Sequence, residues 1–473
     1  MDTKTKANPF DELMALRGGT APLLNDPAGE VTITGSDPVY PTVFRVGDTA
    51  AAVIASIGVV VNDLWESKTG RRQKIAVDTR HAAATMRTAD FTYFRKPDGS
   101  YEPAALDPVM QRMRKRTQPW PTKDGRWFLP HLNLPQLSAR VLAVLKCEDS
   151  PEGVRDGVAK WNADDLEEAI AQARACGGKV RTYDEWLAHP QGQYLAGRPL
   201  IEIEKIADSA PEPMPPCERP LTGIRALDMT RILAGPVAGR TLAEHGAEVL
   251  MVTAKHLPQT PEHVRDTSHG KRSCFLDLAN PDESAKLKDL VRGADVFSQG
   301  YRPGVLAARG FGPEDLAKMR PGIVALTISC YGSGGPYADR AGWEQVAQAV
   351  TGIAHANGAT PTLIHAAACD WITGYLGAYG VLLALKRRAA EGGSYHVRVS
   401  LCQSGMFIQR QGQGVFDPSL SGLSRPEAEV LQIAADTSYG PMRFLRPVVQ
   451  MSETPARWAR VTPKFGADEP RWP

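Results

Sequence analysis

The chain lacks the cysteine pairs that mark disulfide frameworks and zinc sites. No CxxC pair occurs, and the ten histidines form no ligand cluster. The seven cysteines are scattered: Cys147, Cys176, Cys217, Cys274, Cys330, Cys369 and Cys402. An odd number of separated cysteines indicates free thiols in a reducing compartment. We therefore expect a cytoplasmic protein without a metal centre.

Blocks of one charge and long apolar runs are missing as well. The net charge is +2 over 473 residues with no Lys/Arg block, which argues against a nucleic-acid or membrane-surface partner. The first residues, MDTKTKANPFDELMALRGG, lack the apolar core of a signal peptide. No uninterrupted apolar run reaches the roughly 20 residues of a membrane span. We expect neither a nucleic-acid nor a membrane partner.

Common catalytic fingerprints are absent too. The chain has no GxGxxG after a strand, no GxSxG and no HExxH. Residues 268–271 fit SxxK and residues 68–70 read KTG. In penicillin-binding enzymes, however, KTG follows SxxK, and here it precedes it. That order argues against a serine acyl-enzyme.

A proline-rich segment divides the sequence. Residues 208–220, DSAPEPMPPCERP, contain five prolines, which exclude a regular helix or a central strand and indicate a stiff linker. A chain of this length also favours more than one domain. We therefore expect one part over residues 1–207, the linker over 208–220, and a second part over 221–473.

Strand-like and helix-like segments alternate after the linker. Strands are predicted at 224–229, 248–253, 273–278, 295–299, 323–329 and 395–401, and helices at 237–246, 281–293 and 313–320. This alternation predicts an α/β fold with a parallel sheet. Ligands of such sheets bind beyond the carboxyl ends of the strands.

One acidic residue begins a helix of small residues near the C-terminus. Asp370 precedes WITGYLGAYGVLLALKRR, whose glycine-rich face predicts close packing against another backbone. Residues 46–79 align with 368–401 without a gap, at an offset of 322, and Asp48 aligns with Asp370. We interpret the two segments as an internal repeat. By residue type alone, each aspartate is expected to be a helix N-cap.

Five motifs in order resemble the family III CoA-transferases, in particular the formyl-CoA transferase and carnitine CoA-transferase group. They are GIRALDMTR at 223–231, HGKRS at 269–273, YRPG at 301–304, YGSGGPYADRAGW at 331–343 and CDW at 369–371. Residues 67–86 and 181–203 resemble segments that come later in the family. The resemblance thus implies that the family's C-terminal portion stands before its N-terminal portion.

The resemblance implies a fold, an assembly and a reaction. The fold is a Rossmann-like parallel sheet with a smaller α+β domain, and the assembly is an interlocked homodimer. The reaction is reversible transfer of CoA between an acyl-CoA and a carboxylic acid, with CoA as a substrate and no permanent cofactor. The family's aspartate attacks the thioester, an aspartyl-CoA thioester follows, and the acceptor acid collects CoA. Asp370 aligns with this nucleophile, and Asp48 aligns through the repeat.

Further site residues follow from the resemblance. The expected CoA-binding residues are Arg231, Ile232, Ala234, Lys271, Arg272, Tyr301 and Arg302. Glu344 is expected to contact the acyl group. A helix start is expected to lower the pKa of the nucleophilic aspartate and keep it ionised.

Two alternatives to CoA transfer stay open. One is a racemase, isomerase or lyase of the same family that acts on an acyl-CoA. The family's racemases have a His–Asp pair where this chain has Trp343–Glu344, and a tryptophan cannot exchange an α-proton. The other is a CoA-binding protein without turnover.

Overall fold

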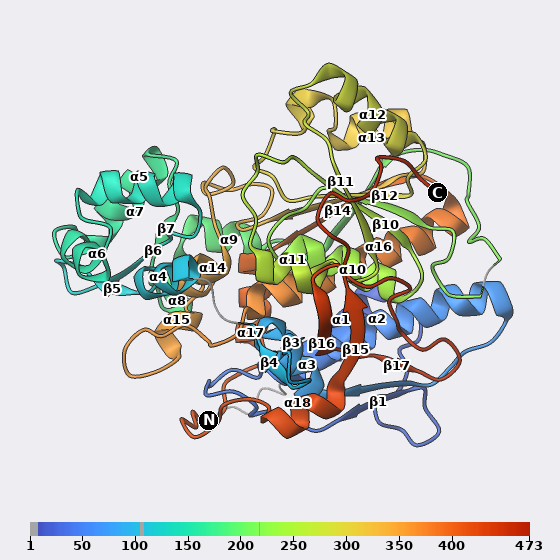
Figure 1. The fold of residues 1–473 in the computed structure, drawn as a ribbon, viewed down its shortest axis with the longest axis horizontal. Coiled ribbons are helices and arrows are strands. Elements are labelled where there is room, and N and C mark those ends of the chain that lie inside the picture. Colours follow the sequence, from blue (N-terminus) through green and yellow to red (C-terminus); the bar gives the residue numbers. More distant parts are fainter. Residues whose placement is uncertain (1–7, 105–107, 217) are drawn as a thin grey trace.

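The computed structural model describes residues 8–104, 108–216 and 218–473, so the predicted Cys217 thiol lies outside the described residues. A main body surrounds a seven-stranded sheet, and a smaller lobe stands to its left in Figure 1. The strands of the large sheet are β8 (Glu202–Ala207), β9 (Arg225–Asp228), β10 (Glu248–Thr253), β11 (Lys271–Phe275), β12 (Val296–Gln299), β13 (Val324–Ser329) and β14 (Ser394–Ser400).

The large sheet runs in the order β11-β10-β9-β12-β13-β14-β8. Strands β9 to β14 are parallel, and β8 is an antiparallel edge strand. Counted from β9, the parallel strands follow the order 3-2-1-4-5-6 of doubly wound sheets. The prediction of a parallel α/β sheet is confirmed. The strand predicted at 273–278 is observed at Lys271–Phe275.

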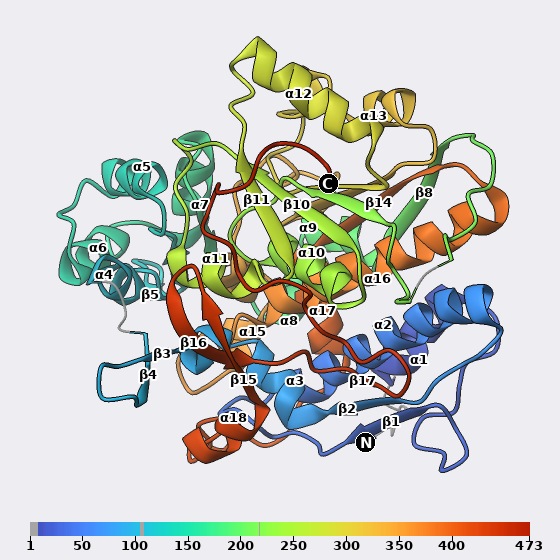
Figure 2. The same ribbon diagram turned by 45° about the vertical axis from the view of Figure 1, so that its right-hand side comes forward.

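Helices cover both faces of this sheet (Figure 2). One face packs on α12 (Pro281–Arg292) and α13 (Pro313–Met319), and the other packs on α10 (Ala234–Glu244) and α16 (Ala368–Glu391). Neighbouring residues of a strand point to opposite faces, so Ala226 joins the α10/α16 core and Leu227 joins the α12/α13 core. Burial on both faces explains why the strands are almost continuously apolar.

Helices α10 and α16 approach closely where the sequence predicts a small-residue face. A Cβ atom built on Gly374 would lie 2.4 Å from the backbone oxygen of Ala234. A backbone atom cannot move aside as a side chain can, so only glycine fits this position. The contact holds the first part of α16 against the start of α10.

The predicted repeat is present as two matching sets of elements. The first set is α2 (Val46–Thr69), β2 (Ile75–Asp78) and α3 (Thr79–Thr85), and the second is α16, β14 and α17 (Leu401–Arg410). Both ends of α16 lie 322 residues after those of α2. The two helices lie side by side, joined by an ion pair of 2.7 Å between Lys386 and Asp63.

Both long helices are core helices. By length and composition alone, α2 and α16 could each cross a membrane. However, 94% of the most apolar 18-residue stretch of each helix is buried inside the protein. Val53 of α2 and Leu376 of α16 belong to one hydrophobic cluster. Their apolar composition is thus explained by packing against each other and against the sheet.

The parts before and after the proline-rich segment share one core. Strand β8 comes from the first part and pairs with β14 of the second. Three smaller sheets contain β1 (Val31–Thr34), β2 and β17 (Gln450–Met451); β3 (Tyr93–Arg95), β4 (Tyr101–Pro103), β15 (Gln432–Thr437) and β16 (Gly440–Leu445); and β5 (Trp120–Pro121), β6 (Trp127–Pro130) and β7 (Gly177–Lys179). The first two of these also join strands from both parts. The division at 208–220 is therefore a division of the sequence and not of the core.

The smaller lobe is α+β and has its own core. Its helices are α4 (Pro108–Arg116), α5 (Pro135–Leu145), α6 (Pro151–Val158) and α7 (Ala163–Gln172), packed on the β5-β6-β7 sheet. Phe128, Val141 and Leu166 lie in a hydrophobic cluster separate from that of the main body. The remaining helices include α1 (Pro9–Arg17), α8 (Tyr183–Ala188), α9 (Pro190–Ala196), α11 (Pro261–Thr267), α14 (Glu344–Val350), α15 (Ile353–Ala356) and α18 (Arg425–Leu431), with the 3-10 turns η1 (Thr88–Phe91) and η2 (Ala307–Arg309).

Candidate active site

A cavity of about 380 Å³ opens at the carboxyl ends of the parallel strands. Its walls include residues 229–233 after β9, residues 300–303 after β12, and residues 328–330 at the end of β13. Strands β9 and β12 are neighbours at the point where the strand order reverses, which is where doubly wound sheets bind ligands. We call this space the arginine cavity, for the side chains described below.

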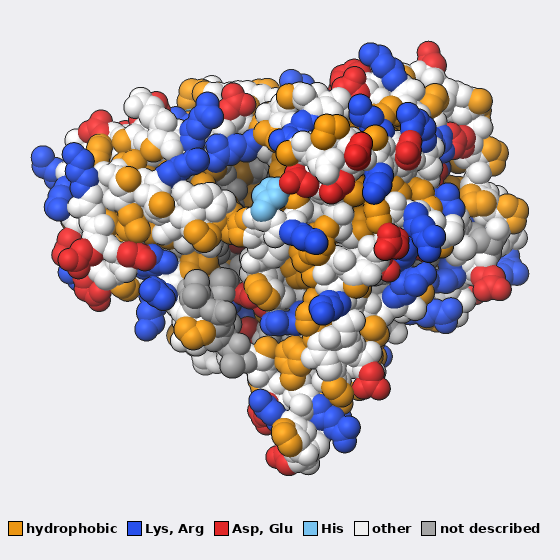
Figure 3. All heavy atoms as spheres, turned by 45° about the horizontal axis from the view of Figure 1, so that its top comes forward, with side chains coloured by type: hydrophobic (Ala, Val, Ile, Leu, Met, Phe, Trp, Pro, Cys, Tyr) orange, Lys and Arg blue, Asp and Glu red, His pale blue; other side chains and the backbone are white. Residues whose placement is uncertain are grey.

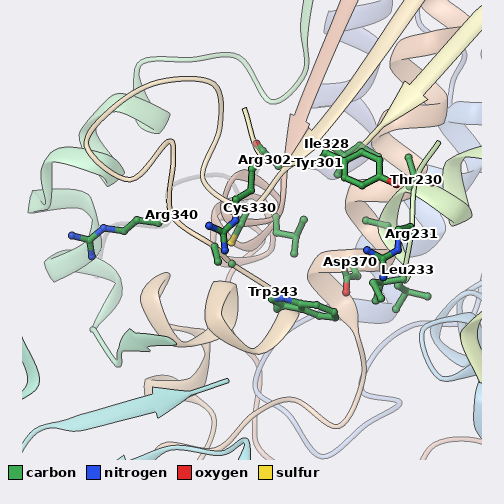
Figure 4. A pocket seen from close by; sticks show the side chains of 18 of the residues that line it. Thr230, Arg231, Leu233, Tyr301, Arg302, Ile328, Cys330, Arg340, Trp343 and Asp370 are labelled. Atoms are coloured by element: carbon green, nitrogen blue, oxygen red, sulfur yellow. The ribbon is translucent and has the colours of Figure 1, made fainter. Parts of the chain in front are cut away.

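Asp370 lies in the wall of the arginine cavity (Figure 4). It is the third residue of α16, whose N-cap is Ala367 without a side-chain capping bond. The carboxylate of Glu344 occupies the capping place instead: it accepts the N–H of Asp370 at 2.5 Å and that of Cys369 at 3.2 Å. The prediction that Asp370 caps the helix is therefore wrong, and its carboxylate is left for other partners.

The acidity of Asp370 also differs from the expectation. Burial, followed by the nearby charge of Glu344, raises the pKa of the Asp370 carboxyl well above its ordinary value. Burial likewise raises the pKa of Glu344. The hydrogen bonds that Glu344 accepts from N–H groups act in the opposite direction, because they stabilise its anion. The expected lowering of the pKa by the helix start is wrong, because desolvation and a like charge outweigh it.

Four arginines give the arginine cavity a basic lining. Arg231 and Arg302 come from the main body and Arg140 comes from α5 of the small lobe; the fourth is Arg340. Figure 3 shows Lys and Arg side chains gathered at a hollow between the two parts. Arg340 is paired with Glu168 at 2.8 Å, but the described carboxylates form no ion pair with the other three. Such a lining suits a polyanionic ligand.

A strained residue marks the same place. Ile232 has a φ of 74°, a conformation that a β-branched side chain rarely adopts and that costs of order 1–3 kcal/mol. It lies in the loop between β9 and α10, beside Asp370 in the cavity wall. Strain of this kind concentrates at functional sites, so the backbone points to the same loop as the charges do.

The comparisons with known proteins agree with this geometry. The family model of CoA-transferase family III matches residues 5–210 and 221–414. The chain belongs to this family. It is an enzyme, a CoA-transferase, and the α/β architecture described above is the family III CoA-transferase fold.

Several relatives resemble the chain. An acyl-CoA transferase of Gibberella moniliformis is 33% identical over 78% of this chain and 72% of its own length. The acetyl-coenzyme A transferase nodX of Hypoxylon pulicicidum is 30% identical over 80% of this chain and 71% of its own. A CAIB/BAIF family protein from Brucella suis is 26% identical, with a TM-score of 0.38 over 48% of this chain and 65% of that structure.

The structure brings most of the predicted site residues of this family III CoA-transferase together. The arginine cavity is lined by Arg231, Ile232, Ala234, Tyr301, Arg302 and Asp370. Glu344 lies directly behind Asp370 and borders a neighbouring cavity that Asp370 also lines. The motifs of Arg231 and Arg302 meet because β9 and β12 are neighbouring strands. Asp370 joins them because α16 packs closely on α10.

Lys271 and Arg272 are not brought to this site. Lys271 is fully buried, with its Nζ 2.7 Å from Asp228 and 2.8 Å from the carbonyl oxygen of Pro236. Arg272 donates instead to the carbonyl of Arg471 at 2.8 Å, in the C-terminal segment. Neither residue lines the arginine cavity, because β11 begins at Lys271 and places this side chain against the first turn of α10.

Asp48 is not brought to Asp370 either. It is the third residue of α2, as Asp370 is of α16, and its N–H donates to the Asp37 carboxylate at 2.7 Å. Its own carboxylate accepts from Arg45 at 2.8 Å and from the Asp37 N–H at 3.1 Å. Asp48 lines neither cavity that Asp370 lines. The repeat preserves the position of the residue but not its surroundings.

Three of the cavity residues that sequence reasoning missed are Arg340, Arg140 and Cys330. Arg340 stands in the motif YADRAGW, so the motif could have identified it. Arg140 and Cys330 gave no signal, because one comes from the small lobe and the other is a lone cysteine after β13. Within residues 8–104, 108–216 and 218–473, no group of three or more His, Cys, Asp or Glu could hold a metal ion.

The pH dependence of turnover tests the environment of Asp370. If the Asp370 carboxylate attacks the thioester, it must be ionised, so kcat/KM falls as the pH falls through its pKa. Because that pKa is raised, we expect the acid limb of the profile above the ordinary aspartate range near 4. Glu344→Gln removes the neighbouring charge and should shift the limb down by about one pH unit.

The control for this profile is Asp339→Asn. Asp339 is an exposed acid in the loop that leads to Glu344 at the start of α14. The substitution should leave the limb in place. An unchanged limb in Glu344→Gln, or a wild-type limb near pH 4, would contradict the arrangement described here.

Proposed function

We propose that the chain moves CoA reversibly between an acyl-CoA and a free carboxylic acid, with Asp370 as the nucleophile. The Asp370 carboxylate attacks the thioester carbonyl, the C–S bond breaks, and CoA leaves as the thiolate. The thiolate then attacks the aspartyl carbonyl of the mixed anhydride and releases the first acid, which leaves an aspartyl-CoA thioester. The acceptor carboxylate repeats these steps in reverse and regenerates Asp370.

One observation carries the proposal: Asp370 borders two cavities at once. The arginine cavity is basic, and the adjoining cavity of about 490 Å³ shares Ile232, Leu233, Trp343 and Asp370 with it. A CoA-transferase must bring a thioester and an acid to one carboxylate in turn. A carboxylate at the junction of two spaces meets this requirement.

The arginine cavity supports the binding of CoA phosphates. Arg140 and Arg302 both donate to the carbonyl of Arg174, at 2.9 and 3.3 Å. Burial, followed by the charges of Arg140 and Arg174, lowers the pKa of Arg302. The guanidinium groups of Arg140, Arg231 and Arg302 line the same cavity, and no described carboxylate forms an ion pair with them. An incoming phosphate would stabilise these three positive charges.

Asp370 rather than Asp48 fits the role of nucleophile. The Asp48 carboxylate is occupied by Arg45 and by the backbone of Asp37. An attack by Asp48 would first break these bonds. We infer that the first copy of the repeat supports the fold, through the packing of α2 on α16, and that the second copy carries the reaction.

The proposal extends to the origin and state of the chain. The family match falls in two segments on either side of residues 211–220, and the first helix of the repeat has the same length and an offset of 322 residues in the two copies, which supports a rearranged family member. The cavity next to Asp370 is far larger than a formyl group needs, so an acyl group longer than that of the formyl-CoA branch is favoured.

We also propose an interlocked homodimer in the cytoplasm. Six described cysteines, none of them in a disulfide, suit a reducing compartment.

A trapping experiment tests this function. The protein is incubated with a panel of acyl-CoA donors and free acids, and new thioesters are identified by mass spectrometry. Hydroxylamine added during turnover should convert the aspartyl thioester to a hydroxamate on the peptide that contains Asp370, and not on the peptide that contains Asp48. Binding of CoA without exchange in any pair would favour a non-catalytic protein, and exchange without a hydroxamate would overturn the mechanism.

A further inference from the structure

The cavity next to the arginine cavity, here called the acyl chamber, is built by segments that are distant in sequence. Its walls comprise residues 86–90, the end of α4, the start of α11 and the loop 362–367. Asp370, Leu233 and Trp343 form its border with the arginine cavity and lie close together in Figure 4. None of the four arginines of the arginine cavity lines the acyl chamber. The two spaces therefore differ in chemistry on either side of one carboxylate.

The interior of the acyl chamber suits a short carbon chain. Met86, Met113, Ile364 and Trp371 contribute apolar surface to its walls. Its volume of about 490 Å³ is typical of a small-molecule site. A chain attached at Asp370 would therefore find apolar contacts before it reaches the far wall.

One cation in the chamber has no counter-charge. Arg87 is neutralised by Asp90, with its Nε 2.8 Å from the carboxylate. Arg114 of α4 also lines the chamber, and no described carboxylate forms an ion pair with it. On the same helix Arg116 pairs with Asp149, while Arg112, which is exposed as Arg114 is, does not line the chamber. Among the described residues of α4, Arg114 is thus the basic residue that lines the chamber and has no ion pair.

The groups around Arg114 leave its charge available. Burial, followed by Arg114, lowers the pKa of His263, and burial, followed by Arg87 and Arg114, lowers that of His365. Both imidazoles are therefore neutral near pH 7 and can donate hydrogen bonds. The acid on this side is Glu262, which lies in the chamber wall without an ion pair to Arg114.

We propose that the acyl chamber takes an acid with a second carboxylate at its far end, a dicarboxylic acid, and that Arg114 binds this distal carboxylate. The inference rests on the proposed function, because one carboxylate must reach Asp370 as a thioester or as an acceptor. The other then forms a charge-assisted pair with the guanidinium. Arg114 would decide which acids are accepted without taking part in the bond changes.

This specificity can be tested by isotopic self-exchange, in which a labelled acid takes CoA from its own unlabelled thioester. Donor and acceptor are then the same acid, so no second substrate has to be chosen. Labelled succinate is incubated with succinyl-CoA, and labelled butyrate, which has the same number of carbons, with butyryl-CoA. We expect wild-type kcat/KM for succinate exchange to exceed that for butyrate by about tenfold or more. Arg114→Gln should lower succinate exchange by about tenfold, mainly through KM, and leave butyrate exchange within about twofold.

The matched control is Arg112→Gln, on the same helix but outside the chamber, which should change neither exchange. Equal losses for both acids in Arg114→Gln, or a wild type that prefers butyrate, would overturn the inference and leave the transferase function standing. If neither these acids nor any acid of the panel exchanges while CoA binds, the proposed function itself has failed.

Discussion

Asp370→Asn is expected to lower kcat for CoA transfer by roughly 10³-fold or more, because it removes the group to which CoA becomes attached in the proposed mechanism. The amide keeps the size of the side chain and relieves the like-charge contact with Glu344, so the fold should be retained. The proposed binding of CoA to the arginine cavity should persist, since those arginines are unchanged. Exchange rates by mass spectrometry and CoA affinity by calorimetry measure the two effects separately.

Asp48→Asn is the matched control for this substitution. The residue has the same position in its helix, but its carboxylate is held by Arg45 and Asp37. Its exchange rate should stay within a few-fold of wild type, with a modest loss of stability. A large loss of turnover in Asp48→Asn with normal turnover in Asp370→Asn would reverse the assignment of the nucleophile.

Lys271→Ala should have the largest effect on stability. The ammonium group lies fully buried against Asp228, and its removal leaves that carboxylate without its counter-charge. Breaking a buried pair costs about 3–5 kcal/mol of the free energy of unfolding. Denaturant unfolding followed by circular dichroism would measure the loss. Lys286→Ala, an exposed lysine on α12, should stay within about 0.5 kcal/mol of wild type.

The same variant decides between two roles for Lys271. If it bound CoA, as the motif resemblance implied, Lys271→Ala would raise KM for acyl-CoA and leave stability nearly unchanged. The buried geometry predicts the reverse: reduced stability, with a near-normal KM in the fraction that remains folded.

Local patterns predicted the elements well where the apolar pattern agreed with the tertiary setting. The strand predicted at 248–253 has those bounds, and the strand predicted at 395–401 is observed one residue earlier. Strand β11 was predicted at 273–278 and is observed two residues earlier, from Lys271. Pairing of Lys271 with Val249 of β10 carries this lysine into the sheet, and Asp228 of the next strand compensates the buried charge.

The candidate site was only partly accessible from the sequence. The motifs containing Arg231, Tyr301 and Asp370 pointed to residues that do meet in the arginine cavity. The small lobe's Arg140 carried no local signal, because its role depends on how α5 faces the sheet. The pKa direction of Asp370 was wrong for the same kind of reason: local position favours the anion, while burial beside Glu344 disfavours it.

By itself, the sequence determined the parallel α/β sheet, the repeated helix–strand unit and the family of the enzyme. Each of these depends on periodicity, spacing or ordered motifs, which are local properties of the chain. Tertiary structure alone decided that Asp370 borders two cavities while Asp48 is occupied by Arg45. The two aspartates stand at equivalent positions in equivalent helices, and they differ in the groups around them: Asp48 is held by the nearby Arg45 and Asp37, whereas Asp370 lies beside Glu344, 26 residues away in the sequence.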